Sequence, residues 1–346
     1  MPKLHLGGGR ALSLALLGVM VLCGCLFTQA ARSTTTQLGA SATGKALIPV
    51  ATPDCGPAAP AVLANAAGEV ATRIYAAELA SSETSSDQHQ VEGDSALLDA
   101  IASGSPSEIE AAVTALVYSH THIVRLRITR GSTVLADVGG PYILAPVGGP
   151  LRLHGRTIAH YVLSVQDDLG YVKLVTRFLD LPLAMRVGSH QLPVEGLLSP
   201  GPPNIPALGA LTYRGVRYEA VSFNVRSFPG GSLRVSLFVA LPSGLSAKSC
   251  SEIKSAELGH AAQLISERFS LTPKALPGYI RLVRTLTHGL LYIRSGAKLL
   301  GGSPGRGPAK LPNGGTVKYR RRSYEVYSFL APSSVGELRV YQLTTP

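Results

Sequence analysis

Residues 124–179 read VRLRITRGSTVLADVGGPYILAPVGGPLRLHGRTIAHYVLSVQDDLGYVKLVTRFL, and this stretch decides the fold of the chain. The runs at 124–129 and 134–138 are rich in β-branched residues and flank a Gly-Ser turn, which predicts a β-hairpin. A loop rich in Gly and Pro follows at 139–149. We interpret this loop as the crossing segment between the hairpin and the strands that follow.

Three further runs after this loop, at 151–154, 156–165 and 171–178, resemble strands. In the last run, Tyr171 and Val175 fall on one face of an extended chain and Leu174 and Phe178 on the other. Polar and Gly residues at 166–170 predict the turn before it. The whole stretch therefore predicts an antiparallel unit of five strands, consisting of a hairpin, a crossing loop and a meander.

The same plan recurs twice, at about 184–241 and about 290–343. Residues 319–329 match residues 213–223 at six of eleven positions, with a constant offset of 106. A match of this quality indicates an internal repeat. We therefore expect an α+β protein with repeated antiparallel five-strand units and N-terminal packing helices.

Helices are expected ahead of the first and third units. Apolar residues at three- and four-residue steps predict helices over 58–80 and from Gly259 onward, and Asp94 and Ser105 begin two more. Residues 81–93 are interpreted as a polar break. The predicted division of the chain is a targeting segment, a linker, a helical preface with unit one, unit two, and a helix with unit three, at 1–30, 31–53, 54–183, 184–245 and 246–346.

The first thirty residues predict export. Lys3 and Arg10 precede an apolar run over 11–23, which is too short for a confident membrane span. Three outcomes stay open: a lipoprotein with Cys25 as the lipidated residue, cleavage after Ala30, or an uncleaved anchor. All three place the rest of the chain outside the cytoplasm, and two of them associate it with the membrane.

Export permits disulfides, and Cys55 and Cys250 are the two cysteines that follow the targeting segment. Each lies just ahead of a predicted helix. They form either a bridge between distant segments or two free thiols.

Charge is distributed unevenly along the chain, whose net charge is +11. Residues 54–123 contain one basic and ten acidic side chains, whereas residues 181–346 contain twenty basic and seven acidic ones. A basic C-terminal half could bind nucleic acid, but export argues against that partner. Contact with an anionic polymer, a lipid or a protein of the cell envelope is the alternative.

The runs Asp137-Val-Gly-Gly-Pro-Tyr142 and Ser164-Val-Gln-Asp-Asp-Leu-Gly-Tyr171, together with the helix and strand plan, resemble extracytoplasmic Cache sensor domains, relatives of the PAS fold. The resemblance covers roughly 94–180 well and the later units only by topology. It implies repeated PAS/Cache-like antiparallel five-strand units with N-terminal packing helices, a small ligand between the sheet and the crossing loop of unit one, and a membrane-bound signalling partner. The short crossing loops and the absence of a second apolar span depart from the family.

The expected function is therefore non-enzymatic binding of a small molecule, with a carboxylate as one candidate, and no cofactor. Five residues are the predicted ligand contacts because of their chemistry and their position in unit one: Arg127, Asp137, Tyr142, His160 and Gln166. A basic side chain beside a tyrosine suits a carboxylate.

Several motifs keep two interpretations. The loop over 139–149 is either a structural crossing that needs Gly or a lid over a pocket, and Asp167-Asp168 is either turn chemistry or a cation contact. His120 and His122 are too few for a closed zinc site, so no metal is expected. Arg320-Arg321-Arg322 is either a solvated turn or an anion contact. No enzyme signature is present, and the rival function is a cell-envelope interaction protein that uses its basic C-terminal half.

Overall fold

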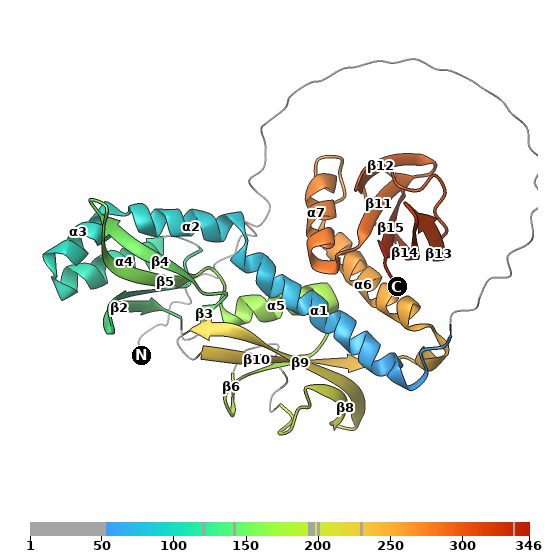
Figure 1. Cartoon of the computed structure of the whole chain (residues 1–346), viewed down its shortest axis with the longest axis horizontal. Helices are drawn as coiled ribbons and strands as arrows, with labels where there is room; N and C mark the ends of the chain where they lie inside the picture. Colours follow the sequence, from blue (N-terminus) through green and yellow to red (C-terminus); the bar gives the residue numbers. More distant parts are fainter. Residues whose placement is uncertain are drawn as a thin grey trace, which may run out of the picture. The chain divides into compact units, whose positions relative to one another are not determined.

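The computed structural model describes residues 53–119, 122–140, 143–192, 198, 201–228, 231–334 and 336–346. In this part of the chain, helices pack on three antiparallel sheets, which confirms the α+β class (Figure 1). Cys25, the targeting segment, the linker up to residue 52, His120 and Tyr142 lie outside the described residues. None of the described helices is both long and apolar enough to cross a membrane.

The first sheet has four strands in the order β2-β1-β5-β4. Its strands are β1 (Arg125–Arg130), β2 (Thr133–Gly139), β4 (Val147–Leu153) and β5 (Arg156–Ser164). Helices α2 (Ser82–Gly93), α3 (Ser95–Ser103) and α4 (Pro106–Ser119) cover one of its faces. Leu126, Ile128 and Leu163 point toward these helices and are fully buried, so this face supplies the core.

The predicted fifth strand of unit one is wrong, because residues 171–178 belong to helix α5 (Asp168–Leu179). Helix α5 buries its apolar residues at helical spacing, namely Tyr171, Val172, Val175 and Phe178. Over so short a run, this spacing can also be interpreted as the alternation of a strand. The predicted turn is the start of this helix: the Asp167 carboxylate accepts the Gly170 backbone N–H.

The predicted break at 81–93 is also wrong, because these residues form helix α2. Ser81 caps the helix by accepting the Thr84 backbone N–H at 3.0 Å. The segment is polar because only one face is buried, against β4. A helix with so few apolar positions gives little periodic signal in the sequence.

The second sheet has the order β3-β9-β10-β6-β7, and β8 also pairs with β9. Its strands are β3 (Ile143–Leu144), β6 (Leu183–Val187), β7 (His190–Gln191), β8 (Leu208–Tyr213), β9 (Val216–Phe228) and β10 (Gly231–Ala240). Helix α1 (Ala59–Leu79) packs on β9 and β10, and α5 contacts α1 and β3 (Figure 1). The predicted helical preface of unit one is therefore divided, with α1 on the second sheet and α2–α4 on the first.

The third sheet has five strands in the order β12-β11-β15-β14-β13. They are β11 (Leu290–Ser295), β12 (Lys298–Ser303), β13 (Gly314–Tyr319), β14 (Arg322–Ala331) and β15 (Leu338–Thr344). Helix α6 (Cys250–Arg268) packs on β14 and β15, and α7 (Leu276–Thr287) on β11 and β12. This sheet has the predicted five-strand plan.

The repeat is visible in matching contacts. Tyr171 on α5 donates its hydroxyl to Ala71 O at 3.0 Å, and Tyr279 on α7 donates to Ala262 O at 2.9 Å. Each contact joins the shorter helix to the long helix of the same pair. Helix α5 therefore corresponds to α7, and the first sheet with α2–α4 is an insertion between α1 and α5.

A disulfide joins Cys55 to Cys250 across a sequence separation of 195 residues. Beside it, Asp54 forms a β-bridge with Ser249, and the Cys55 backbone N–H donates to Lys248 O at 2.8 Å. The chain therefore enters the described fold where α6 begins.

Candidate functional site

In the second and third sheets, the face away from the helices is covered by the sheet's own crossing loop. Arg186 on β6 donates to the carbonyls of Pro202 and Pro203. Arg294 on β11 donates to Pro308 O at 2.8 Å and to Ala309 O at 3.1 Å.

Apolar clusters fill the space beneath both loops. The cluster in the second sheet contains Ala184, Ile205, Ala220 and Phe238. The cluster in the third contains Tyr292, Tyr324, Val326, Tyr341 and Leu343. In these two sheets the interface between sheet and loop is therefore packed with the protein's own side chains.

In the part of the chain that the structure describes, the first sheet holds its crossing loop differently, with Arg125 donating to Gly140 O at 3.1 Å. Its strand β1 has a register shift between Ile128 and Thr129, and β11 has the same shift between Ile293 and Arg294. Thr129 therefore occupies the position of the arginine that holds the crossing loop in the third sheet. The segment after β2 instead provides β3, which pairs with the end of β9.

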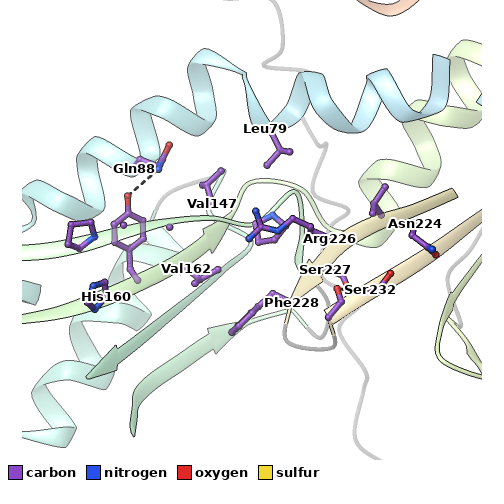
Figure 2. Close-up of a pocket in the computed structure, with 17 residues that line it drawn as sticks. Leu79, Gln88, Val147, His160, Val162, Asn224, Arg226, Ser227, Phe228 and Ser232 are labelled. Carbon is purple, nitrogen blue, oxygen red and sulfur yellow. Dashed lines mark hydrogen bonds between the residues drawn. The ribbon is translucent and has the colours of Figure 1, made fainter. Parts of the chain in front are cut away.

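The edge strand β4, part of the outer face of the first sheet, Leu79 of α1, Gln88 of α2 and the end of the second sheet line an open groove of about 1090 Å³. Figure 2 shows His160 and Val162 of the first sheet on one side and Arg226, Ser227 and Phe228 of β9 on the other. The full lining is Leu79, Gln88, Pro146, Val147, Gly148, Gly149, Pro150, His160, Tyr161, Val162, Asn224, Val225, Arg226, Ser227, Phe228, Gly231 and Ser232.

The lining combines apolar surface with polar and cationic groups, and it contains no Asp or Glu. His160, Asn224, Arg226 and Ser232 are exposed. Within the described residues, Arg226 forms no ion pair. Its guanidinium can therefore accept an anion without first giving up a carboxylate partner.

The predicted contacts Arg127 and Asp137 pair with each other at the side of the groove. The Asp137 carboxylate accepts from Arg125 at 2.7 Å and also pairs with Arg127. Burial opposes ionisation of Asp137, but the hydrogen bonds and charges of the two arginines outweigh it and lower the pKa of the carboxyl. The Arg127 guanidinium lies 4.1 Å from the centre of the Phe228 ring. Through Phe228 this cluster supports the groove wall.

Tyr75 on α1 links the segment between β3 and β4 to the end of β9. Its hydroxyl accepts the Ala145 backbone N–H at 3.1 Å and donates to the carbonyl of Arg226. Ser164, at the end of β5, donates to the carbonyl of Leu144 in β3. These bonds set the spacing between the first sheet and the end of β9.

The predicted contact Gln166 lies away from the groove lining. With its amide oriented so that both atoms find matching partners, it donates to Glu78 at 2.9 Å and accepts the Tyr171 backbone N–H at 2.6 Å. Burial, with a further contribution from the charge of Glu83, raises the pKa of Glu78 to about 7. Glu78 lies just before the insertion begins and Gln166 just before α5, so this pair joins the two ends of the insertion.

The acidic and histidine motifs have structural partners. Asp167 caps α5, and burial raises the pKa of its neighbour Asp168. His122 pairs with Glu83. No cluster of metal-ligating side chains occurs within the described ranges.

Of the five predicted contacts, the structure therefore places His160 in the groove lining, Arg127 and Asp137 beside it, and Gln166 apart from it. Sequence reasoning missed Arg226 and Phe228, because both come from the predicted second unit. The internal repeat holds a signal that could have suggested them. Unit two has Arg-Ser-Phe at 226–228, whereas the corresponding positions of unit three do not, so these residues are a difference between the two copies. No protein-family model matches the chain, and no curated protein sequence matches it.

Proposed function

We propose that the protein is an exported, non-enzymatic binding protein of Cache-like type that takes a small carboxylate in the groove of the first sheet. The expected position of a Cache ligand, between a sheet and its crossing segment, motivates this proposal. Residues 146–149 of the predicted crossing loop line the groove, together with the sheet residue His160. Export remains the expectation from the N-terminal sequence.

One observation carries the proposal. The same sheet face is filled by a crossing loop and an apolar cluster in the second and third sheets, but in the first sheet its residues His160 and Val162 line a groove. A difference of this kind between copies of one scaffold supports a binding role for the copy that borders the groove. The groove volume lies just above the range of about 300–1,000 Å³ that is typical of small-molecule sites, so it has room for such a ligand.

The donors in the lining favour an anion over a cation or an apolar ligand. Arg226 offers a planar guanidinium that matches a carboxylate, and Asn224 and Ser232 add neutral donors. The apolar wall made by Val162 and Phe228 suits the carbon skeleton of an organic acid. No acidic side chain in the lining opposes such a ligand.

The test is a thermal-stability titration of the dialysed full chain with a panel of amino acids and organic acids. A carboxylate that binds the native state raises Tm, by an amount that grows with its concentration. Arg226→Gln removes the guanidinium and is expected to weaken binding about tenfold or more, since charged hydrogen bonds contribute about 1.5–3 kcal/mol.

Arg217→Gln is the matched control, because Arg217 is exposed on the same strand but lies outside the groove lining. It is expected to bind like the unchanged protein. No shift with any member of the panel, or equal losses in Arg226→Gln and Arg217→Gln, would contradict the proposal.

A further inference from the structure

The third sheet carries a strongly basic surface that the groove does not use. Residues 268–324 contain twelve Lys and Arg and no Asp or Glu. We define the basic tip as Arg306, Lys310, Lys318 and Arg320–Arg322, which lie on the crossing loop and around the turn between β13 and β14. All six side chains are exposed.

The structure holds the parts of the basic tip together. Tyr319 donates its hydroxyl to the carbonyl of Arg306 at 3.3 Å, so the turn lies beside the crossing loop. The Arg320 guanidinium lies 5.1 Å from the centre of the Tyr319 ring. In the part of the chain that the structure describes, no tip residue forms an ion pair. The tip thus presents concentrated positive charge to solvent.

The backbone of the turn shows that this charge is kept at a conformational cost. Arg320 and Arg321 have φ values of 50° and 65°. The corresponding turn of the second sheet has Arg214 at 50° and Gly215 at 79°. The left-handed region suits Gly and is unfavourable for Arg. Arg321 of the third sheet therefore occupies the position at which the second sheet has Gly215, the residue type that this turn prefers.

The described chain begins beside the start of α6, and the predicted targeting segment lies at the far end of the residues that precede it. The disulfide and the bridge at Asp54 hold the chain entry against the start of α6, the first helix packed on the third sheet. Residues 31–53 are 23 residues, which reach at most about 80 Å when fully extended. A surface within that reach experiences a raised effective concentration of the third sheet.

From these observations we infer that the basic tip docks on an anionic lipid surface. Charge complementarity and the tethered route of the chain favour a lipid surface over a soluble polyanion. Tyr319 is the one aromatic residue at the turn, and it is held against Tyr292 and Tyr324. The contact is therefore electrostatic and is weakened by salt. This inference does not depend on the groove.

The test compares the partition of the full chain onto vesicles of phosphatidylcholine alone and of phosphatidylcholine mixed with phosphatidylglycerol. The variant combines Arg320→Gln, Arg321→Gly and Arg322→Gln. Each basic side chain near an anionic surface contributes about fivefold, so the preference for the anionic vesicles is expected to fall about a hundredfold. The N-terminal segment is the same in both proteins and cannot account for the difference.

The control combines Arg214→Gln and Arg217→Gln at the corresponding turn of the second sheet, and it is expected to keep the preference. Thermal melting checks folding, and the Gly at position 321 relieves the turn. An unchanged preference in the tip variant overturns the inference. So does binding of the unchanged protein to soluble polyphosphate without any preference for anionic vesicles.

Discussion

At the residue scale, Glu78 is a carboxyl at the junction with the insertion whose ionisation is opposed by burial. It lies in the last turn of α1 beside Gln166, where the chain returns from the first sheet. Its pKa is raised from 4.5 to about 7, because burial and the neighbouring Glu83 both oppose its negative charge. A carboxyl in this position makes the junction more stable when it is protonated.

The expected pH dependence follows from the direction of this shift. Below pH 4.5 the carboxyl is protonated in both the folded and the unfolded chain, so its contribution to stability is fully present. That contribution is lost as the pH rises to about 7, because the unfolded chain releases its proton first. We expect Glu78→Gln to raise the free energy of unfolding by about 1–3 kcal/mol at neutral to alkaline pH and to change little in acid.

Urea unfolding of the variant across this pH range measures the effect. Glu110→Gln, on the exposed side of α4, serves as the control and is expected to leave the pH profile unchanged. A Glu78→Gln profile parallel to that of the unchanged protein would show that this carboxyl is not linked to folding.

At the element scale, the long helix of each repeat crosses its sheet at a glycine. A Cβ added at Gly259 in α6 would overlap the ring of Tyr327 on β14, and one at Gly68 in α1 would come within 3.1 Å of Val221 on β9. Tyr327 and Val221 stand at the repeat offset of 106 residues. The two glycines therefore allow the same close approach of helix and sheet in both copies.

We expect Gly259→Ala to lower the free energy of unfolding by about 1–3 kcal/mol, because the ring or the helix must shift. Gly278→Ala in α7 is the matched substitution, since no atom lies within 4 Å of its added Cβ. It is expected to raise stability by about 0.5–1 kcal/mol through helix propensity. Chemical denaturation of the two variants checks the pair, and equal effects would contradict this account of the helix crossing.

The elements that sequence reasoning predicted correctly are those with a long periodic signal or a repeat. Helix α1, both hairpins of the first sheet and the strands of the third sheet belong to this group. Helix α5 was missed because an eight-residue window fits alternation almost as well as a 3.6-residue period. Its N-cap, Asp167, was the signal that distinguished the two, and it was interpreted as a turn.

The groove was beyond sequence reasoning for a different reason. Strand β3 has two residues, and their partners on β9 are 85 and 83 residues further along the chain. Local propensity cannot specify such a short pairing. Without it, the crossing loop is expected to cover its own sheet, as it does in the second and third sheets. The contribution of Arg226 and Phe228 to the site follows from this one rearrangement.

At the scale of the whole molecule, the Cys55–Cys250 disulfide closes most of the described chain between the starts of α1 and α6. A bridge over so many residues restricts the unfolded chain strongly, by about 3–5 kcal/mol in the chain-entropy description. We expect the double variant Cys55→Ser, Cys250→Ser to unfold at a correspondingly lower urea concentration.

Reductant is expected to lower the midpoint of the unchanged protein to that of the double variant and to leave the variant unaffected. Mass spectrometry after alkylation confirms that the bond has been reduced. A reduced protein that unfolds at the same midpoint as the oxidised one would contradict a stabilising role of the bridge.

We propose that a ligand binds the groove beside the first sheet. Hydrogen exchange of the dialysed full chain, with and without the pooled carboxylates at matched ionic strength, tests it most directly. We expect slower exchange in the segments that line the groove, at 147–150, 160–162 and 224–228, and unchanged exchange at the loop-covered faces of the second and third sheets. Unchanged exchange at the groove, or protection confined to the other two sheets, would contradict the claim.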